Sequence, residues 1–164
     1  MGQSTLPSQL YHGLTLDRFV EHWEAGCIRA FSKHHVDPEG NRKGVWLSDS
    51  FDYIIENKHG MEYTDDVLIE TELLGKKITC HKMKTGIILE LSNVPNHNAL
   101  VPLFVPNQLF YFGEIPISYI DRVHVDQRHD EQWKARDIRQ LLERGVPGDK
   151  ISVYDPFTRL IELR

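Results

Sequence analysis

Three stretches of the chain place hydrophobic residues at the spacing of an α-helix. The first has its apolar members at positions i, i+3, i+4 and i+7, and these are Leu16, Phe19, Val20 and Trp23. Thr15 suits the N-cap and Gly26 the C-terminal end, so we predict a helix through Ala25. A second helix is predicted over residues 51–57 and a third over residues 130–144.

Elsewhere the hydrophobic pattern has the period of two that is typical of strands. We interpret residues 78–83 and 87–91 as a hairpin joined by Lys84-Thr85-Gly86. Pro102 interrupts the apolar run at 100–105, which indicates an edge strand or a bent segment. The other predicted strands are residues 10–14, 45–47, 67–73, 109–112, 119–125, 151–154 and 160–163.

The order and number of these elements indicate one domain of the α+β class. Strands outnumber helices, and neither internal repeats nor linkers divide the chain. At 164 residues the chain is long enough for one core and short for two. We therefore expect a flexible, polar N-terminus at residues 1–9 and a single domain at residues 10–164.

Composition narrows the classes of function. A formal net charge of -5 disfavours a broad nucleic-acid or acidic-membrane surface. The chain shows neither a signal peptide nor an apolar stretch long enough to span a bilayer, so we expect a cytoplasmic protein, with export by a specialised system left open. Two cysteines do not make a disulfide scaffold, and a reducing compartment is expected.

Several kinds of chemistry find little support. The nine histidines lack the spacing of a strong zinc site, so no metal is expected. Cys27 follows a helix end, where nothing activates its thiolate. A basic cluster is formed by Arg29, Ser32-Lys33-His34-His35, Arg42 and Lys43. We interpret it as a solvated loop; the alternative is that it contacts the phosphates of a dinucleotide or of an acceptor nucleic acid.

Three short motifs follow one another along the chain. The first is Tyr11-His12-Gly13, the second Gly44-Val45-Trp46-Leu47-Ser48-Asp49, and the third runs from Gln108 to Pro116. In this order and spacing they resemble the strand motifs of the ADP-ribosyltransferase superfamily. The resemblance covers roughly residues 10 to 125. It implies a fold of two packed, antiparallel-rich sheets with three flanking helices.

The resemblance also implies roles for individual residues. His12 would hold the ribose on the nicotinamide side of NAD, while the Gly13 backbone would pair with the carboxamide. Trp46 would form a wall of the nicotinamide pocket; taken alone it favours an ordinary core role, and its place after Gly44-Val45 makes the two interpretations equal. Further implied contacts to NAD are Tyr11, Ser48, for which local capping is the alternative, and Tyr53, for which it is core packing.

The third motif departs from the family's pattern. Where the family usually carries its catalytic glutamate, this chain has Gln108. A carboxylate stabilises the positive charge that develops when the bond between nicotinamide and ribose breaks, whereas an amide hydrogen-bonds without charge and does not act as a base. A shift in register would bring Glu114 to the site instead, and Glu90 is a weaker candidate.

These observations leave three functional hypotheses. The first is an enzyme that transfers ADP-ribose from NAD to a protein or nucleic-acid acceptor and releases nicotinamide. The second is a catalytically inactive module of the same fold that binds a nucleotide or a protein, because a fold does not establish activity. The third is an NAD-cleaving toxin or phage effector, in which water is the acceptor. The chain does not indicate its oligomeric state.

Overall fold

A computed structural model describes residues 7–29, 43–56, 62–84, 86–95, 99–100, 106–126 and 131–154 of the protein. The predicted strand at 160–163, most of the segment at 100–105 and most of the basic cluster lie outside these ranges. In chain order the elements are β1 (Gln9–Leu14), α1 (Leu16–Ala25), β2 (Cys27–Ile28), β3 (Gly44–Ser48), α2 (Phe51–Glu56), β4 (Glu62–Leu73), β5 (Lys76–Lys84), β6 (Ile87–Ser92), β7 (Ala99–Leu100), β8 (Gln108–Phe112), β9 (Ile115–Pro116), η2 (Ile117–Tyr119), β10 (Ile120–Asp126), α3 (Glu131–Glu143), η3 (Gly148–Lys150) and β11 (Ile151–Tyr154).

The largest sheet has the strand order β11-β10-β6-β1-β3-β8-β7. The β10–β11 pair is parallel, and the other neighbouring pairs of this sheet are antiparallel. β2 and β9 form a separate two-stranded sheet, as do β4 and β5. The predicted α+β class is therefore confirmed, with a mixed main sheet at its centre.

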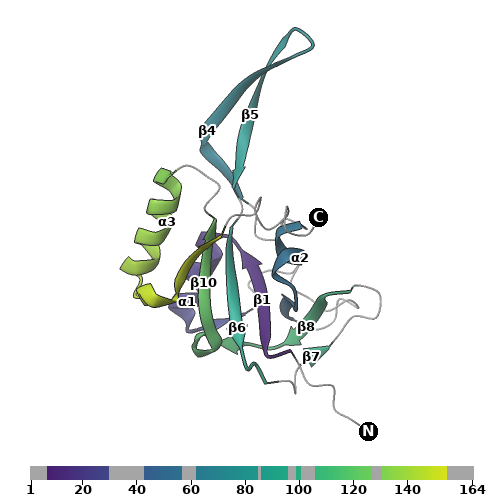
Figure 1. Ribbon diagram of the computed structural model, residues 1–164, viewed down its shortest axis with the longest axis vertical. Coiled ribbons are helices and arrows are strands. Elements are labelled where there is room, and N and C mark those ends of the chain that lie inside the picture. The colour runs from purple at the N-terminus through teal and green to yellow at the C-terminus, as the bar shows by residue number, and fades with distance from the viewer. Residues whose placement is uncertain are drawn as a thin grey trace.

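The helices cover both faces of the main sheet (Figure 1). Along β6 the side chains alternate, so Leu89 joins the core beneath α1 and α3, whereas Ile88 joins the core beneath α2. Phe19 of α1 and Leu141 of α3 are fully buried in the first core. Phe51 of α2 is buried in the second. Both faces of the central strands are thus packed.

Helix α1 begins and ends as its sequence predicts. The Thr15 hydroxyl accepts a hydrogen bond from the Arg18 backbone N–H group at 3.3 Å, which caps the first turn. Gly26 closes the helix with φ at 77°, a left-handed conformation that favours glycine, and its N–H group donates to the Trp23 carbonyl. This end delivers the chain directly into β2.

The predicted hairpin of residues 78–91 is wrong. β5 pairs with β4, and their turn lies at Leu74-Gly75, where both residues have positive φ. Positive φ at two successive residues is typical of a two-residue hairpin turn. Leucine rarely adopts a positive φ, so the sequence pattern did not indicate a turn at this position. β6 instead lies between β1 and β10 in the main sheet, where residues 87–91 are buried.

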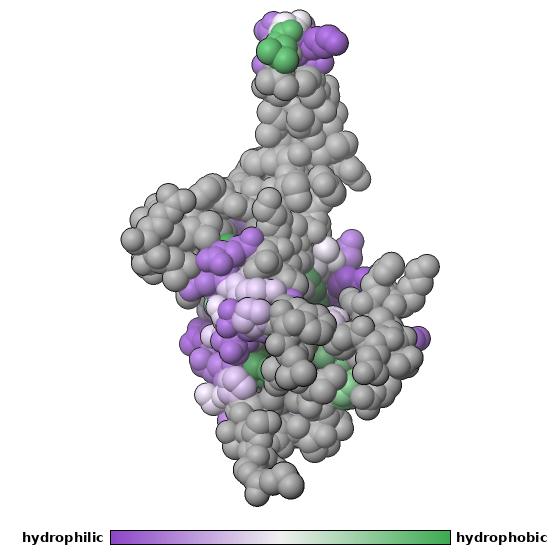
Figure 2. Space-filling model, turned by 90° about the vertical axis from the view of Figure 1, so that its right-hand side faces the viewer, coloured by the Kyte–Doolittle hydropathy of each residue, from purple (hydrophilic) through white to green (hydrophobic). Residues whose placement is uncertain are grey.

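The β4–β5 hairpin extends away from the main sheet (Figure 1). At its outer end the Leu74 side chain is 96% exposed. Figure 2 shows hydrophobic surface there among hydrophilic neighbours.

Three predicted strands are confirmed: residues 109–112 lie in β8, the strand through Val123 is β10, and residues 151–154 are β11. Within the described ranges every helix is too short or too polar to cross a bilayer.

Candidate functional site

The main sheet opens between β1 and β3. β1 pairs with β6 over six positions, from Gln9 to Leu14, but its register with β3 is confined to Tyr11 opposite Ser48. β3 then pairs with β8 along its whole length, from Gly44 to Ser48. The two strands consequently part beyond Tyr11, and the motifs at His12-Gly13 and Val45-Trp46 border the opening.

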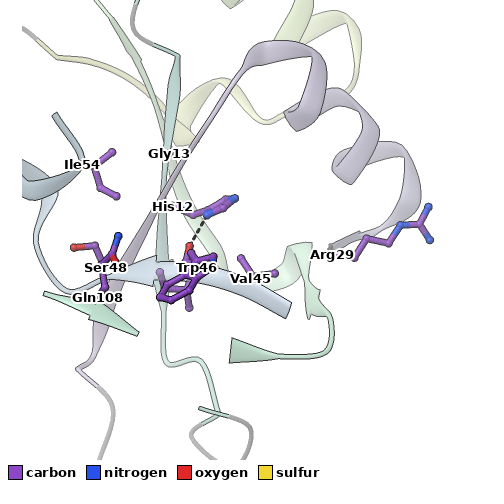
Figure 3. A pocket seen from close by; sticks show the side chains of 9 residues that line it. His12, Gly13, Arg29, Val45, Trp46, Ser48, Ile54 and Gln108 are labelled. Carbon is purple, nitrogen blue, oxygen red and sulfur yellow. Dashed lines mark hydrogen bonds between the residues drawn. The ribbon is translucent and has the colours of Figure 1, made fainter. Parts of the chain in front are cut away.

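A side chain bridges this opening. The Nδ1 atom of His12 lies 2.7 Å from the backbone carbonyl oxygen of Trp46 (Figure 3). Because a carbonyl oxygen only accepts, Nδ1 carries the proton and donates it. In the neutral ring, Nε2 then holds the lone pair and is an acceptor. The imidazole therefore fixes the distance between β1 and β3 and has a defined tautomer.

A pocket of about 190 Å³ occupies the opening. By strand alternation the side chains of His12 and Trp46 belong to opposite faces of the sheet, yet both reach the pocket because the strands part there. The residues that line it are His12, Gly13, Arg29, Val45, Trp46, Leu47, Ser48, Ile54 and Gln108. Residues from the first, second and third sequence motifs thus meet in one cavity.

Aromatic packing positions the Trp46 ring at the side of the pocket. The Trp46 ring meets the Phe110 ring edge to face, with centroids 5.1 Å apart and an interplanar angle of 71°. Gly44 allows β3 and β8 to come this close, since a Cβ atom there would lie 2.1 Å from the Tyr111 carbonyl oxygen and under 3 Å from the Phe110 ring. The motif's glycine is accordingly required for backbone packing.

Ser48 lines the pocket and also organises the start of α2. Its hydroxyl donates to the Ser50 carbonyl at 3.1 Å and accepts from the Ser50 N–H group at 3.0 Å. The Ser50 hydroxyl in turn accepts from the Tyr53 N–H group at 3.2 Å, as an N-cap does. The hydroxyl proton of Ser48 is therefore already donated within the chain.

Gln108 lies beside Ser48 at the start of β8, and the two are register partners. Its side chain is half-buried and lines the pocket. The side-chain amide makes no hydrogen bond to any residue that the structure describes. It is thus available to donate to, or accept from, a bound molecule.

Arg29 lines the pocket at the end opposite Ser48 and Gln108 (Figure 3). Its backbone N–H group donates to Nδ1 of His22, which is buried in α1, at 3.3 Å. The sequence analysis interpreted this arginine as part of a solvated loop, with contact to the phosphates of a dinucleotide or of an acceptor nucleic acid as the alternative. The signal that points to it is its position directly after β2, three residues beyond the glycine that ends α1.

Three predicted site residues lie away from the pocket. Tyr11 packs against Phe51 of α2, with ring centroids 5.5 Å apart, and is not among the lining residues. Tyr53 is half-buried on α2 and is not among the lining residues. Glu114 is exposed beyond the end of β8, so the structure brings Gln108 to the pocket and leaves Glu114 outside it.

Glu90, the weaker carboxylate candidate, is also elsewhere. It faces the α2 side of the sheet, where its carboxylate accepts from the Gln9 amide at 2.8 Å and lies 2.9 Å from Nε2 of His124. The Phe51 ring covers that histidine, with centroids 5.0 Å apart. Glu90 therefore belongs to a packed polar cluster on β6 and β10.

Burial and the carboxylate of Glu114 both shift the pKa of the Cys27 thiol. Burial raises the pKa of the Cys27 thiol, and the hydrogen-bonded carboxylate of Glu114 raises this pKa further, while Arg29 acts weakly in the opposite direction. A raised pKa keeps the thiol protonated and unreactive near neutral pH.

Across the described ranges, no three His, Cys, Asp or Glu side chains gather as metal ligands would.

Comparison of the sequence with models of known protein families found no match, and a search of curated proteins also found none.

Proposed function

We propose that the protein is an ADP-ribosyltransferase that takes NAD as substrate, releases nicotinamide and transfers ADP-ribose to a protein or nucleic-acid acceptor. One observation carries the proposal: five of the eight residues that the motif resemblance singled out line a single pocket. They come from three strands far apart in the sequence, and they are His12, Gly13, Trp46, Ser48 and Gln108.

The topology supports the same proposal. β1, β3 and β8, which hold the three motifs, are consecutive neighbours in the sheet. The single register pair between Tyr11 and Ser48 divides the main sheet into two halves, β11-β10-β6-β1 and β3-β8-β7. These strands nevertheless belong to one continuous sheet, whereas the resemblance implies two packed sheets.

In this proposal the nicotinamide ring lies in the opening between the indole of Trp46 and the imidazole of His12. Nε2 of His12 accepts from a ribose hydroxyl, because Nδ1 is committed to the Trp46 carbonyl. Where β1 and β3 have parted, the Gly13 backbone pairs with the carboxamide. Such fixed contacts orient the glycosidic bond for attack by an acceptor.

Gln108 then positions the ribose by hydrogen bonds and supplies no charge. The bond from nicotinamide nitrogen to the ribose anomeric carbon breaks, its electron pair leaves with nicotinamide, an acceptor lone pair forms the new bond, and the acceptor's proton passes to solvent. Since an amide stabilises the developing positive charge less than a carboxylate, we expect slow turnover.

The same glutamine favours a second candidate, a catalytically inactive module that binds NAD or a related nucleotide. Among the described residues that line the pocket, none carries a carboxylate. The fluorescence of Trp46 and a nicotinamide assay separate the candidates. The transferase predicts that NAD quenches tryptophan emission and that nicotinamide is released with acceptor present, whereas the binding module predicts quenching alone.

A Trp46→Phe variant assigns the fluorescence signal. If NAD binds in the opening, quenching is largely lost in this variant while the binding of NAD, followed by calorimetry, persists. Absence of both quenching and nicotinamide release in the wild-type protein, across varied acceptors, would contradict the proposal and its alternative as an NAD-binding module.

A further inference from the structure

We infer that His22 is a positioning residue that holds Arg29 at the pocket, and that Arg29 recognises the diphosphate of a dinucleotide. The inference rests on the proposed function for the identity of the ligand. The placement of Arg29 by His22 stands on the contacts of these two residues alone.

His22 is a buried polar residue on a helix whose other buried residues are hydrophobic. It is 2% exposed and projects from α1, whose buried neighbours at Leu16 and Phe19 are hydrophobic. Burying an imidazole costs free energy unless its nitrogens are satisfied. Its Nδ1 atom accepts a hydrogen bond from the Arg29 N–H group at 3.3 Å. Because a nitrogen that accepts a hydrogen bond carries no proton, Nδ1 of His22 is unprotonated.

This bond fixes a short segment that ends at Arg29. Gly26 ends α1, and its carbonyl accepts from the Ile117 N–H group at 3.2 Å. Cys27 and Ile28 then pair with β9. After these contacts, the hydrogen bond from the Arg29 N–H group to His22 holds the backbone of Arg29, whose side chain lines the pocket.

His22 also stands behind the pocket's own histidine. The rings of His12 and His22 have centroids 6.4 Å apart at an angle of 63°. The imidazole of His22 on α1 therefore contacts two residues that line the pocket, His12 on β1 and Arg29 after β2.

The charge at this end of the pocket indicates its ligand. Among the described lining residues, Arg29 is the cation and no side chain is acidic. A guanidinium presents a planar set of donors that matches phosphate oxygens. Ser48 and Gln108 lie at the other end, where the proposed function places the ribose next to nicotinamide. A dinucleotide that spans the pocket would therefore bring its diphosphate toward Arg29.

The test compares His22→Asn with His22→Leu. Asparagine places a carbonyl oxygen near the position of Nδ1 and keeps the acceptor, whereas leucine fills the volume without one. We expect the Arg29 amide to exchange with solvent at the wild-type rate in His22→Asn and at least about tenfold faster in His22→Leu. NMR of ¹⁵N-labelled protein measures this and shows whether Nδ1 of His22 is unprotonated.

Binding provides the second readout. We expect His22→Leu and Arg29→Gln to weaken NAD about fivefold or more while nicotinamide binding stays within about twofold, with His22→Asn restoring NAD affinity. Arg18→Gln, which removes an exposed guanidinium on α1, is the control and leaves both affinities unchanged.

Equal exchange of the Arg29 amide in all variants, or equal damage by His22→Asn and His22→Leu, overturns the positioning role. An equal loss of NAD and nicotinamide in Arg29→Gln overturns diphosphate recognition. If the wild-type protein binds neither NAD nor nicotinamide, the proposed function and the diphosphate assignment fail together, and the exchange rates still decide the positioning role.

Discussion

The imidazole of His12 donates through Nδ1 to the backbone carbonyl of Trp46 at 2.7 Å, and so joins β1 to β3 beyond the end of their ladder. The bond replaces a backbone pairing that the opening of the sheet removes. It also leaves Nε2 as the ring's acceptor, which is the atom that the proposed function assigns to the ribose.

Replacement of His12 separates these two roles. His12→Ala loses the bridge, and we expect the free energy of unfolding to fall by about 1 kcal/mol. His12→Asn keeps a donor near the position of Nδ1 and retains more of this stability. Both variants lack Nε2, so both weaken NAD at least about tenfold. Urea denaturation and calorimetry measure the two effects, and wild-type NAD affinity in His12→Ala would contradict the assignment.

Gln108 limits the rate of the proposed reaction. Gln108→Glu places a carboxylate beside the developing positive charge, and we expect nicotinamide release to rise at least about tenfold. Glu114→Gln is the matched control, because Glu114 is exposed and outside the pocket, and its rate stays at the wild-type value. If Gln108→Glu binds NAD without faster release, the binding module is favoured over the enzyme.

Gly44 sets the packing of β3 on β8. Gly44→Ala would force a Cβ atom against the Tyr111 carbonyl oxygen at 2.1 Å, so we expect a loss of about 1–3 kcal/mol or more in the free energy of unfolding. Gly148→Ala provides a control, since its Cβ atom would lie 3.6 Å from Leu142, an ordinary contact. Urea midpoints for the two variants should differ clearly, and equal midpoints would show that β3 moves without cost.

Leu74 occupies the outer turn of the β4–β5 hairpin at a φ of 54°. An L-residue other than asparagine, aspartate or glycine loses about 1–2 kcal/mol in this region. Leu74→Asn should therefore slow amide exchange along β4 and β5, whereas Gly75→Ala, at a φ of 78°, should speed it. Unchanged exchange in Leu74→Asn would mean that the turn is not the weak point of the hairpin.

Cys27 gives a pH-dependent prediction. Burial and Glu114 raise the pKa of its thiol, so at a given pH a smaller fraction is thiolate, and alkylation by iodoacetamide is slower than for a free thiol. The pH profile of the rate is thus displaced to higher pH. Glu114→Gln lowers the pKa and moves the profile back. A Cys80→Ser background isolates Cys27, and a profile that does not move would contradict the effect of Glu114.

The sequence predicted elements whose determinants are local. Thr15 and Gly26 bound α1 because capping depends on groups within one turn of the helix. β8 was predicted from the apolar run Leu109-Phe110-Tyr111-Phe112 that Gly113 closes, and β10 from the alternation of Val123 and Val125. The hairpin was misplaced because its turn uses a leucine at positive φ, while Lys84-Thr85-Gly86 has ordinary turn composition.

The pocket was predicted in part, for a similar reason. The motifs located His12, Trp46 and Gln108, but the Tyr11 ring packs against Phe51 and does not line the pocket. Arg29 was predicted only as a member of the basic cluster, because its place at the pocket depends on the pairing of β2 with β9 and on the buried acceptor at His22. Such long-range contacts leave no pattern in the neighbouring sequence.

A crystal structure of the protein soaked with NAD tests the proposed site most directly. We predict the nicotinamide ring in the opening between β1 and β3, with its carboxamide at the Gly13 backbone, a ribose hydroxyl at Nε2 of His12 and Gln108 beside the anomeric carbon. NAD bound on another surface, or a pocket that stays closed to nicotinamide at saturating concentration, would contradict the proposal.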